Sequence, residues 1–391
     1  MKRQKTTHWA SLAVLTAMLL PAATQAAEDG KLRVGFMLPY SGTYASLGHA
    51  ITNGFKQHVD ELGGKIAGRT VEYVTVDDES DPAKATENAG KLIKRDKVDV
   101  IVGTVHSGVA LALTRVARET NTLLINPNAG ADEITGALCA PNIFRVSFSA
   151  WQPSYAMGNV MLERKHKNVV TLTWKYSFGE QSVAAFKEAF EKGGGKVVKE
   201  MTLPFPNTEF QPYLTEIAAL KPDAVFVFFA GAGAAKFVKD YAAAGLKASI
   251  PLYGPGFLTD GTLEAMGDAG AGLLTTLHYA DGLDNAKDKA FRTRYAITYK
   301  LQPDVYAVQG YDAAQLLATG VSAVKGDLGK RAELVKAMET AKVDSPRGAF
   351  QLSRAHNPIQ DIYLRKVEGR ENKVVGMAAK ALADPARGCK M

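Results

Sequence analysis

A long hydrophobic run is the first thing that this sequence lacks. Its N-terminal apolar stretch, Ala10–Leu20, is too short to cross a bilayer comfortably, which argues against a membrane anchor. Three basic residues precede the stretch and small residues follow it, in the order typical of a secretory signal peptide. We therefore expect residues 1–26 to be cleaved after Ala26. No cysteine follows that point, which argues against a lipoprotein anchor.

Cysteine is scarce as well, and its scarcity excludes a metal centre built on clustered thiolates. Only Cys139 and Cys389 occur among 391 residues, and no Cys/His cluster has the spacing of a zinc site. In an exported protein, an even number of cysteines favours a disulfide. We expect a Cys139–Cys389 bridge across some 250 residues. The alternative is two unrelated thiols.

Long runs of one charge are also absent. The signal peptide carries three basic residues and no acids, so its removal lowers the formal net charge from +7 to +4. A mildly basic chain without a Lys/Arg run gives little support to nucleic-acid binding. We expect no nucleic-acid partner.

Signatures of catalysis are weak or missing. Gly231 and Gly233 follow an apolar strand, but the third glycine of a G-x-G-x-x-G fingerprint is replaced by Lys236. The G-x-S-x-G motif is absent. His106 and Ser107 are adjacent in sequence, so their side chains usually point apart and do not form a nucleophile–base pair. An exported oxidoreductase is therefore disfavoured, and we expect a protein that is not an enzyme and needs no cofactor.

What the sequence does contain is an alternation of short apolar strands and amphipathic helices. Nearly continuous apolar, β-branched strands suit a parallel sheet covered on both faces, and the alternation indicates doubly wound α/β domains. The first series runs over 31–38, 45–62, 70–78, 82–96, 98–103 and 122–126, with Asp81 as the expected N-cap of the helix that starts at Pro82. The second runs over 168–174, 180–192, 196–203 and 210–246.

Two such series predict two Rossmann-like lobes. Helices at 288–299, 306–324 and 331–340 lack a strong strand between them, so we expect them to pack on the first lobe. The chain then crosses between lobes three times, which gives a first lobe of 27–147 plus 280–355 and a second of 148–279 plus 356–391. Such a three-segment hinge permits closure as a rigid-body rotation. Ligands of open α/β sheets bind beyond the carboxyl ends of the strands, in this case in the cleft.

Several motifs carry a family resemblance over essentially the whole mature chain. "VGFMLPYSGTYASLG", "VDVIVGTVHSG", "LLINPNAG" and "YSFGE" resemble the leucine/isoleucine/valine-binding protein family. "SFSAWQPSYAMG" and "HNPIQDIYLRKVEG" are similar to a branch thought to carry aromatic or other organic carboxylates. The resemblance implies a type I periplasmic binding protein: a periplasmic, monomeric receptor that closes on a small carboxylate and delivers it to the membrane permease of an ABC transporter.

The resemblance assigns the carboxylate of the ligand to the first lobe. The matching positions are Ser107, Asn128 and Gly130, with His106 beside them. Unsatisfied N–H groups and the dipole at a helix start favour an anion, and the Ser107 hydroxyl adds a donor, so no basic side chain is needed. The plainer interpretation of Ser107 is a helix N-cap, and the two roles are compatible.

The second lobe is informative through a missing acid. Relatives that bind amino acids hold the ammonium with an acid in a "GPEG"-like turn, whereas this chain has Gly256 at the matching position and Phe257 next to it. A buried ammonium without a partner costs several kcal/mol, so we expect a ligand without an α-amine unless an acid such as Asp281 takes the role. An amino-acid receptor and a ligand-sensing lobe for a signalling partner remain the alternatives.

An apolar wall should fill the remaining space. Trp151 is considered only as a weaker candidate, because single aromatic residues more often belong to a core. The residues that we expect to line the site, in addition to the carboxylate-binding set, are Tyr44, Leu47, Tyr176, Phe178, Ala230, Gly231, Gly256, Phe257 and Tyr279.

Overall fold

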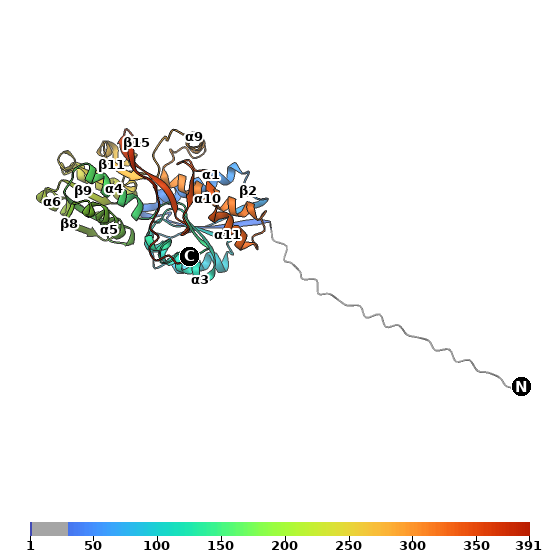
Figure 1. Ribbon diagram of the computed structural model, residues 1–391. Helices are drawn as coiled ribbons and strands as arrows, with labels where there is room; N and C mark the ends of the chain where they lie inside the picture. The colour runs from blue at the N-terminus through green and yellow to red at the C-terminus, as the bar shows by residue number, and fades with distance from the viewer. Residues whose placement is uncertain (2–29) are drawn as a thin grey trace.

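The computed structural model describes Met1 and residues 30–391. Its elements form two α/β lobes, one carrying α1, α3 and α10 and the other carrying α5, α6 and β9 (Figure 1). Apart from Met1, the expected signal peptide lies outside the described residues. Within the described part, no helix combines the length and the apolar character that a membrane crossing requires.

The first lobe is built on a six-stranded sheet in the order β2-β3-β1-β4-β5-β6. Its strands are parallel, as their apolar, β-branched sequences predicted, except that the short β2 pairs antiparallel with β3. The strands are β1 (Lys31–Leu38), β2 (Lys65–Ile66), β3 (Arg69–Asp77), β4 (Val100–Gly103), β5 (Leu123–Asn126) and β6 (Ile143–Arg145).

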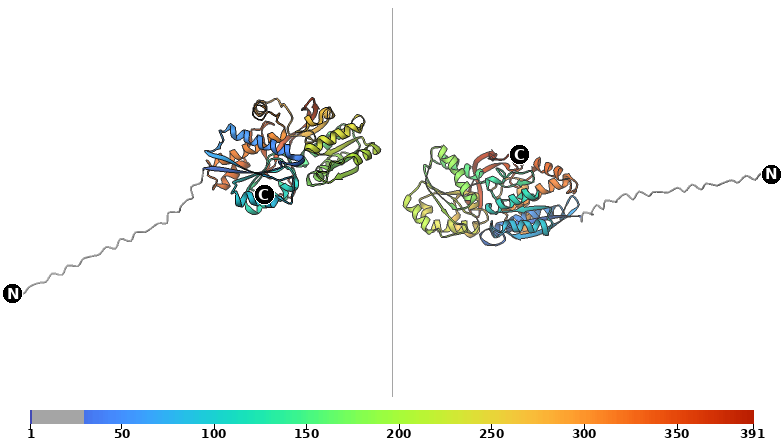
Figure 2. Two further views of the ribbon diagram at one scale, coloured as in Figure 1. Left: turned by 180° about the vertical axis from the view of Figure 1, so that it is seen from behind. Right: turned by 90° about the horizontal axis from the view of Figure 1, so that it is seen from below.

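Helices cover both faces of this sheet because side chains alternate between the faces along each strand. Phe36 of β1 packs on one face with α1 and α10, and Met37 packs on the other face with α2 and α3. The blue and orange helices of this layer lie together in both views of Figure 2. The helices are α1 (Ala45–Glu61), α2 (Ala85–Gly90), α3 (Ser107–Thr120), α9 (Ala286–Tyr299), α10 (Val305–Ala323) and α11 (Arg331–Glu339).

The second lobe has a nine-stranded mixed sheet in the order β12-β13-β14-β11-β10-β9-β7-β8, with β15 also paired to β14. Strands β7 to β11 are parallel, whereas β12 to β15 pair antiparallel. The strands are β7 (Asn168–Trp174), β8 (Lys196–Leu203), β9 (Ala224–Phe228), β10 (Leu252–Pro255), β11 (Leu274–Leu277), β12 (Lys342–Val343), β13 (Phe350–Leu352), β14 (Pro358–Glu368) and β15 (Glu371–Leu382).

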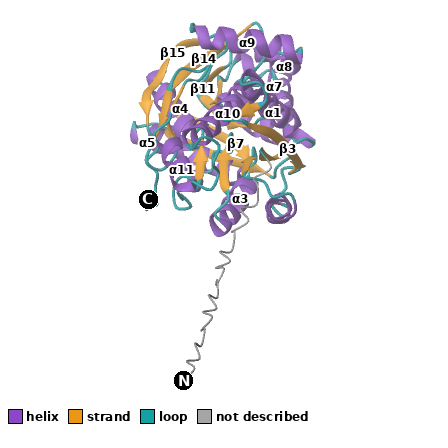
Figure 3. Ribbon diagram, turned by 90° about the vertical axis from the view of Figure 1, so that its right-hand side faces the viewer, coloured by secondary structure: helices purple, strands orange, loops and turns teal. Residues whose placement is uncertain are grey.

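The second sheet is also sandwiched between helices. Phe226 of β9 packs with α4 and α5, and Val227 packs on the opposite face with α6 and α7. Figure 3 shows the strands between layers of helices. The helices are α4 (Trp151–Glu163), α5 (Ser177–Lys192), α6 (Gln211–Leu220), α7 (Gly231–Ala243) and α8 (Leu263–Met266).

Local chemistry moved several expected boundaries. The carboxylate of Asp81 accepts a hydrogen bond from the Ala83 amide at 2.9 Å, which closes a local turn, so α2 begins at Ala85 and not at Pro82. A π-helical turn, η2 (Lys91–Arg95), completes that segment. Helix α4 and strands β6 and β15 were not expected. Trp151, the weaker candidate for the site, is the first residue of α4 and stacks on Tyr155.

Three chain segments join the lobes: β6 to α4, β11 to α9, and the stretch from α11 to β14, whose short strands β12 and β13 extend the second sheet. Arg347, in the third segment, is buried and binds the first segment through the carbonyl oxygens of Val146 (2.6 Å) and Ser147 (3.4 Å). It also binds Gln360 and forms a buried ion pair with Asp312 of α10 at 3.0 Å. The expected lobe boundaries at 147/148, 279/280 and 355/356 remain a prediction around this cluster.

The end of the chain returns to the first lobe. Cys389 forms the expected disulfide with Cys139, with the two Cα atoms 5.5 Å apart, and the C-terminus lies on the lobe of α3 (Figure 1). Arg387, two residues earlier, pairs with Glu188 of α5 at 2.9 Å. The tail after β15 therefore contacts both lobes, although we had expected residues 356–391 in the second.

Loss of this disulfide should destabilise the protein. Because the bridge closes a loop of 250 residues, we expect the double variant Cys139→Ser/Cys389→Ser to lose about 2–5 kcal/mol of unfolding free energy, as measured by urea denaturation. Wild-type protein under reducing conditions should show the same loss. An unchanged unfolding free energy in both samples would show that the bridge does not form in solution.

Candidate ligand-binding site

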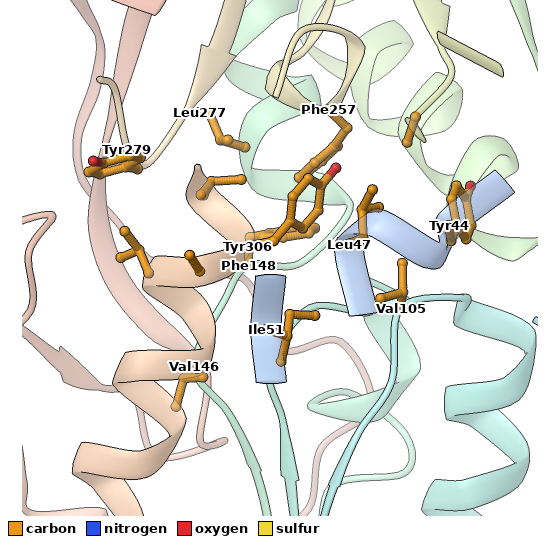
Figure 4. Close-up of a cluster of buried hydrophobic side chains, with 14 of the residues drawn as sticks. Tyr44, Leu47, Ile51, Val105, Val146, Phe148, Phe257, Leu277, Tyr279 and Tyr306 are labelled. Carbon is orange, nitrogen blue, oxygen red and sulfur yellow. The ribbon is translucent and has the colours of Figure 1, made fainter. Parts of the chain in front are cut away.

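A small cavity lies where the two lobes meet. About 260 Å³ is not filled by atoms, so a small ligand suits it. Most lining residues follow the carboxyl ends of strands in the two sheets, where ligands of α/β folds bind. They are Tyr44, Leu47, Val105, Asn128, Gly130, Phe148, Tyr176, Phe178, Phe228, Ala230, Phe257 and Tyr306, several of which surround the cavity in Figure 4.

The first-lobe wall includes the start of α3. The N-cap is His106, whose Nδ1 accepts a hydrogen bond from the Gly108 amide at 3.1 Å, so Ser107 is the first helical residue and not the cap. The Ser107 Oγ accepts a hydrogen bond from the Ala131 amide at 3.2 Å, which leaves the hydroxyl proton available to donate. Ser107 thus lies next to the lining residue Gly130 and does not itself line the cavity.

Two buried main-chain N–H groups on this wall lack a partner. Neither the Ser107 amide nor the Gly130 amide donates a hydrogen bond to any residue of the described chain. Both residues are buried. A buried, unpaired N–H is rare and costly in proteins. At the start of α3 these two donors form an environment suited to an anion.

Asn128 takes part in a buried chain of amides. Its Nδ2 donates to Gln309 Oε1 at 2.7 Å, and the Gln309 Nε2 lies 3.4 Å from His278 Nε2. Burial lowers the pKa of His278 well below its usual range, with the nearby Arg347 as a second cause, so this imidazole is neutral. One of the two N–H donors of the Asn128 amide is therefore bonded to α10, which fixes Asn128 as a polar group of the cavity lining.

Phenylalanine rings make up most of the apolar wall. Phe178 packs on Phe228 with ring centroids 4.4 Å apart, and Phe148 packs on Phe257 at 4.6 Å. The Phe178 ring lies so close to Gly130 that a Cβ at this glycine would be 2.3 Å from it. Only glycine fits at position 130 in this arrangement, and the rings create a dry surface suited to another aromatic ring.

Tyrosine hydroxyls supply most of the polar side-chain atoms. The hydroxyls of Tyr44 and Tyr176 are hydrogen-bonded at 2.9 Å across the two lobes. The Tyr306 hydroxyl is buried and has no partner among the described residues. The ring of His106 stacks on Tyr176 at 4.3 Å, and burial lowers the pKa of this imidazole to about 4. His106 is therefore neutral at pH 7 and offers no cation to a carboxylate.

The lobes also contact each other at the rim. The Gly233 amide donates to Thr43 Oγ1 at 3.2 Å. Gln181 of α5 accepts from the Asp132 amide at 2.8 Å and donates to Glu133 at 2.7 Å. At Gly231, a Cβ would lie 2.2 Å from the Thr43 carbonyl oxygen. The structure therefore has the lobes closed over the cavity, and Gly231 belongs to the rim and not to the lining.

Besides Gly231, two further residues that were predicted to line the site lie outside the cavity. A Cβ at Gly256 would lie 2.2 Å from the guanidinium of Arg365, so this position faces a buried ion pair and not the cavity. The hydroxyl of Tyr279 donates to Asp288 at 2.8 Å, away from the cavity residues in Figure 4. Asp281 was the acid considered as an alternative partner for a ligand ammonium. In the structure it is paired with Arg292 at 3.2 Å.

The remaining predicted lining residues do meet at the cavity, but four others were missed. Val105 and Phe148 lie within motifs singled out in the sequence, and Phe228 ends an apolar strand, so a rule that strand ends line the site would have found them. Tyr306 lies on α10, far along the chain, and nothing local marks it. The described residues contain no group of three metal-binding side chains.

Known proteins resemble this chain over nearly its whole length. The model of the periplasmic binding protein family matches residues 31–372. An ABC-transporter solute-binding protein from R. palustris, solved in complex with benzoate, is 55% identical, with a TM-score of 0.91 and coverage of 92% of this chain and 100% of that chain.

Two further relatives are also similar to this chain over most of its length. A solute-binding protein of an ABC transporter from Rhodopseudomonas palustris BisB5, solved with 3,4-dihydroxybenzoic acid, is 34% identical, with a TM-score of 0.86 and coverage of 91% and 99%. "Leu/Ile/Val-binding protein homolog 6" of Brucella melitensis biotype 1 is 32% identical over 363 residues, 90% of this chain and 92% of that protein.

These matches confirm the resemblance and the two-lobed α/β fold expected from the sequence. The family consists of substrate-binding receptors of transporters. The chain therefore belongs to the periplasmic binding protein family and is a solute-binding protein of the ABC-transporter type.

Proposed function

We propose that this protein captures a small aromatic carboxylate of the benzoate class in the periplasm and delivers it, by clamp closure, to the membrane permease of an ABC transporter. The observation that carries the proposal is the cavity itself: four phenylalanines line it, and no charged side chain among the described residues does. The relative that is 55% identical binds benzoate. Export through a cleaved leader, a monomeric state and the absence of a cofactor are parts of the same proposal.

The carboxylate is assigned to the first-lobe wall. No cation lines the cavity among the described residues, so the charge needs hydrogen-bond donors. We assign this role to the unpaired amide of Gly130, which lines the cavity, and to that of Ser107, which lies next to Gly130. The Ser107 hydroxyl adds a third. The aromatic ring then lies among Phe148, Phe178, Phe228 and Phe257, where a flat apolar body replaces water.

An amino acid fits the same cavity poorly. Its ammonium would need a carboxylate partner, but no acid lines the cavity. Asp260 is paired with Arg365 at 2.7 Å and Asp281 with Arg292. Phe257 takes the cavity-facing place in the turn where amino-acid-binding relatives are expected to carry an acid. The proposed ligand, an aromatic carboxylate, therefore differs from the amino acids in the name of the Brucella relative.

Removal of the Ser107 hydroxyl should weaken the binding of benzoate. We expect Ser107→Ala to cost about 1.5–3 kcal/mol of binding free energy, the range for a hydrogen bond to a charged group, as measured by calorimetry. Ser182→Ala is the matched control, because Ser182 is buried in α5 and bonded to Ser154, away from the cavity. Equal affinities for benzoate in wild type and Ser107→Ala would place the anion elsewhere.

The ligand class is tested by a direct comparison. Benzoate should give a saturable calorimetric isotherm and raise the melting temperature, because it binds only the folded state. Leucine at the same concentration should do neither, since burying its ammonium without a partner costs several kcal/mol. Tight binding of leucine would refute the proposal.

A further inference from the structure

The hydroxyl of Tyr306 is the unexplained polar group of the cavity. Tyr306 is 1% exposed, lines the cavity, and its hydroxyl has no hydrogen-bond partner among the described residues. Leaving a buried hydroxyl unpaired costs about 1–3 kcal/mol, whereas a phenylalanine of the same shape would avoid that cost. Such a group at a ligand site indicates a polar atom of the ligand.

The position of Tyr306 is fixed by the start of α10. The N-cap Asp304 accepts a hydrogen bond from the Ala307 amide at 3.0 Å, which holds the first turn in which Tyr306 lies. The ring centroids of Tyr306 and Phe257 are 6.5 Å apart. In Figure 4 the hydroxyl points towards Phe257, whereas Val105, which leads into α3, lies on another side of the cavity. Tyr306 and Val105 therefore line different sides of the cavity.

The charges around this hydroxyl favour a neutral partner over an anion. Burial, with added contributions from the carboxylates of Asp260 and Asp304, raises the pKa of Tyr306 well above its usual range, so the phenol stays protonated. The carboxylate of Asp260, whose charge Arg365 partly offsets, would repel an anionic group of a ligand at the same place. The carboxylate of a ligand is thus better held at the start of α3.

We propose that Tyr306 forms a polar subsite for a hydroxyl group on the ligand ring, para to the carboxylate, so that the protein prefers 4-hydroxybenzoate-type acids to benzoate. The phenol of Tyr306 both donates and accepts, and so does a ligand hydroxyl, which makes them a matched pair. This inference rests on the proposed function, because it takes the carboxylate to lie at Ser107 and Gly130.

The first test uses the wild-type protein and three ligands. 4-Hydroxybenzoate should bind roughly five- to tenfold more tightly than 4-methylbenzoate, which has a similar size and cannot form the hydrogen bond. Benzoate provides the reference without a substituent. If 4-hydroxybenzoate binds no better than 4-methylbenzoate, the subsite does not exist.

The second test removes the hydroxyl of the protein. Tyr306→Phe should lower the ratio of the 4-hydroxybenzoate affinity to the benzoate affinity by roughly five- to tenfold. Tyr241→Phe is the matched control, because the buried Tyr241 hydroxyl donates to the Ile250 carbonyl, outside the cavity, at 2.9 Å. That variant should bind every ligand as the wild type does.

The outcomes separate this inference from the proposed function. An equal loss for benzoate and 4-hydroxybenzoate in Tyr306→Phe would mean that Tyr306 contacts the shared carboxylate, which overturns the subsite and leaves the proposed function standing. If none of the three aromatic acids binds to the wild type while leucine does, the proposed function fails and the subsite fails with it.

Discussion

The ion pair between Arg347 and Asp312 is the interaction on which the two-lobed arrangement depends. It is buried at the hinge, and the same guanidinium holds the main chain at Val146 and Ser147. Loss of one partner would leave an uncompensated buried charge, which is strongly destabilising. One side chain thus joins two of the linking segments to α10.

No charged side chain among the described residues lines the cavity. Under the proposed function, this absence of a counter-charge selects the class of ligand. Fixed amides compensate a negative charge without offering a mobile counter-ion, and they cost no reorganisation when the ligand arrives. The rings around them exclude water, which strengthens each hydrogen bond in the cavity. An ammonium group gains nothing from such surroundings. The same fold thus admits different ligand classes through a few residues at strand ends.

Sequence reasoning predicted the fold from the alternation of strands and helices, and the family resemblance supplied most of the residues that line the cavity. Residues that follow strand ends, such as Asn128, Phe178 and Phe257, had to face the cleft. It failed where long-range contacts decide the direction of a side chain. Gly256 and Tyr279 face Arg365 and Asp288, which no local pattern connects to them. Tyr306 was missed although the helix that carries it was predicted on the first lobe, because no local pattern indicates which side chain of α10 reaches the cavity.

The missing side chain of Gly231 determines how narrow the gap between the lobes becomes. The group that it faces is the carbonyl of Thr43, which belongs to the main chain and cannot rotate aside. A methyl group there would hold the two rims apart by about the width of a methyl group. Solvent would then enter and compete for the amides on the opposite wall. Because Gly231 has only a hydrogen atom at this place, the two rims meet and solvent is kept out of the cavity.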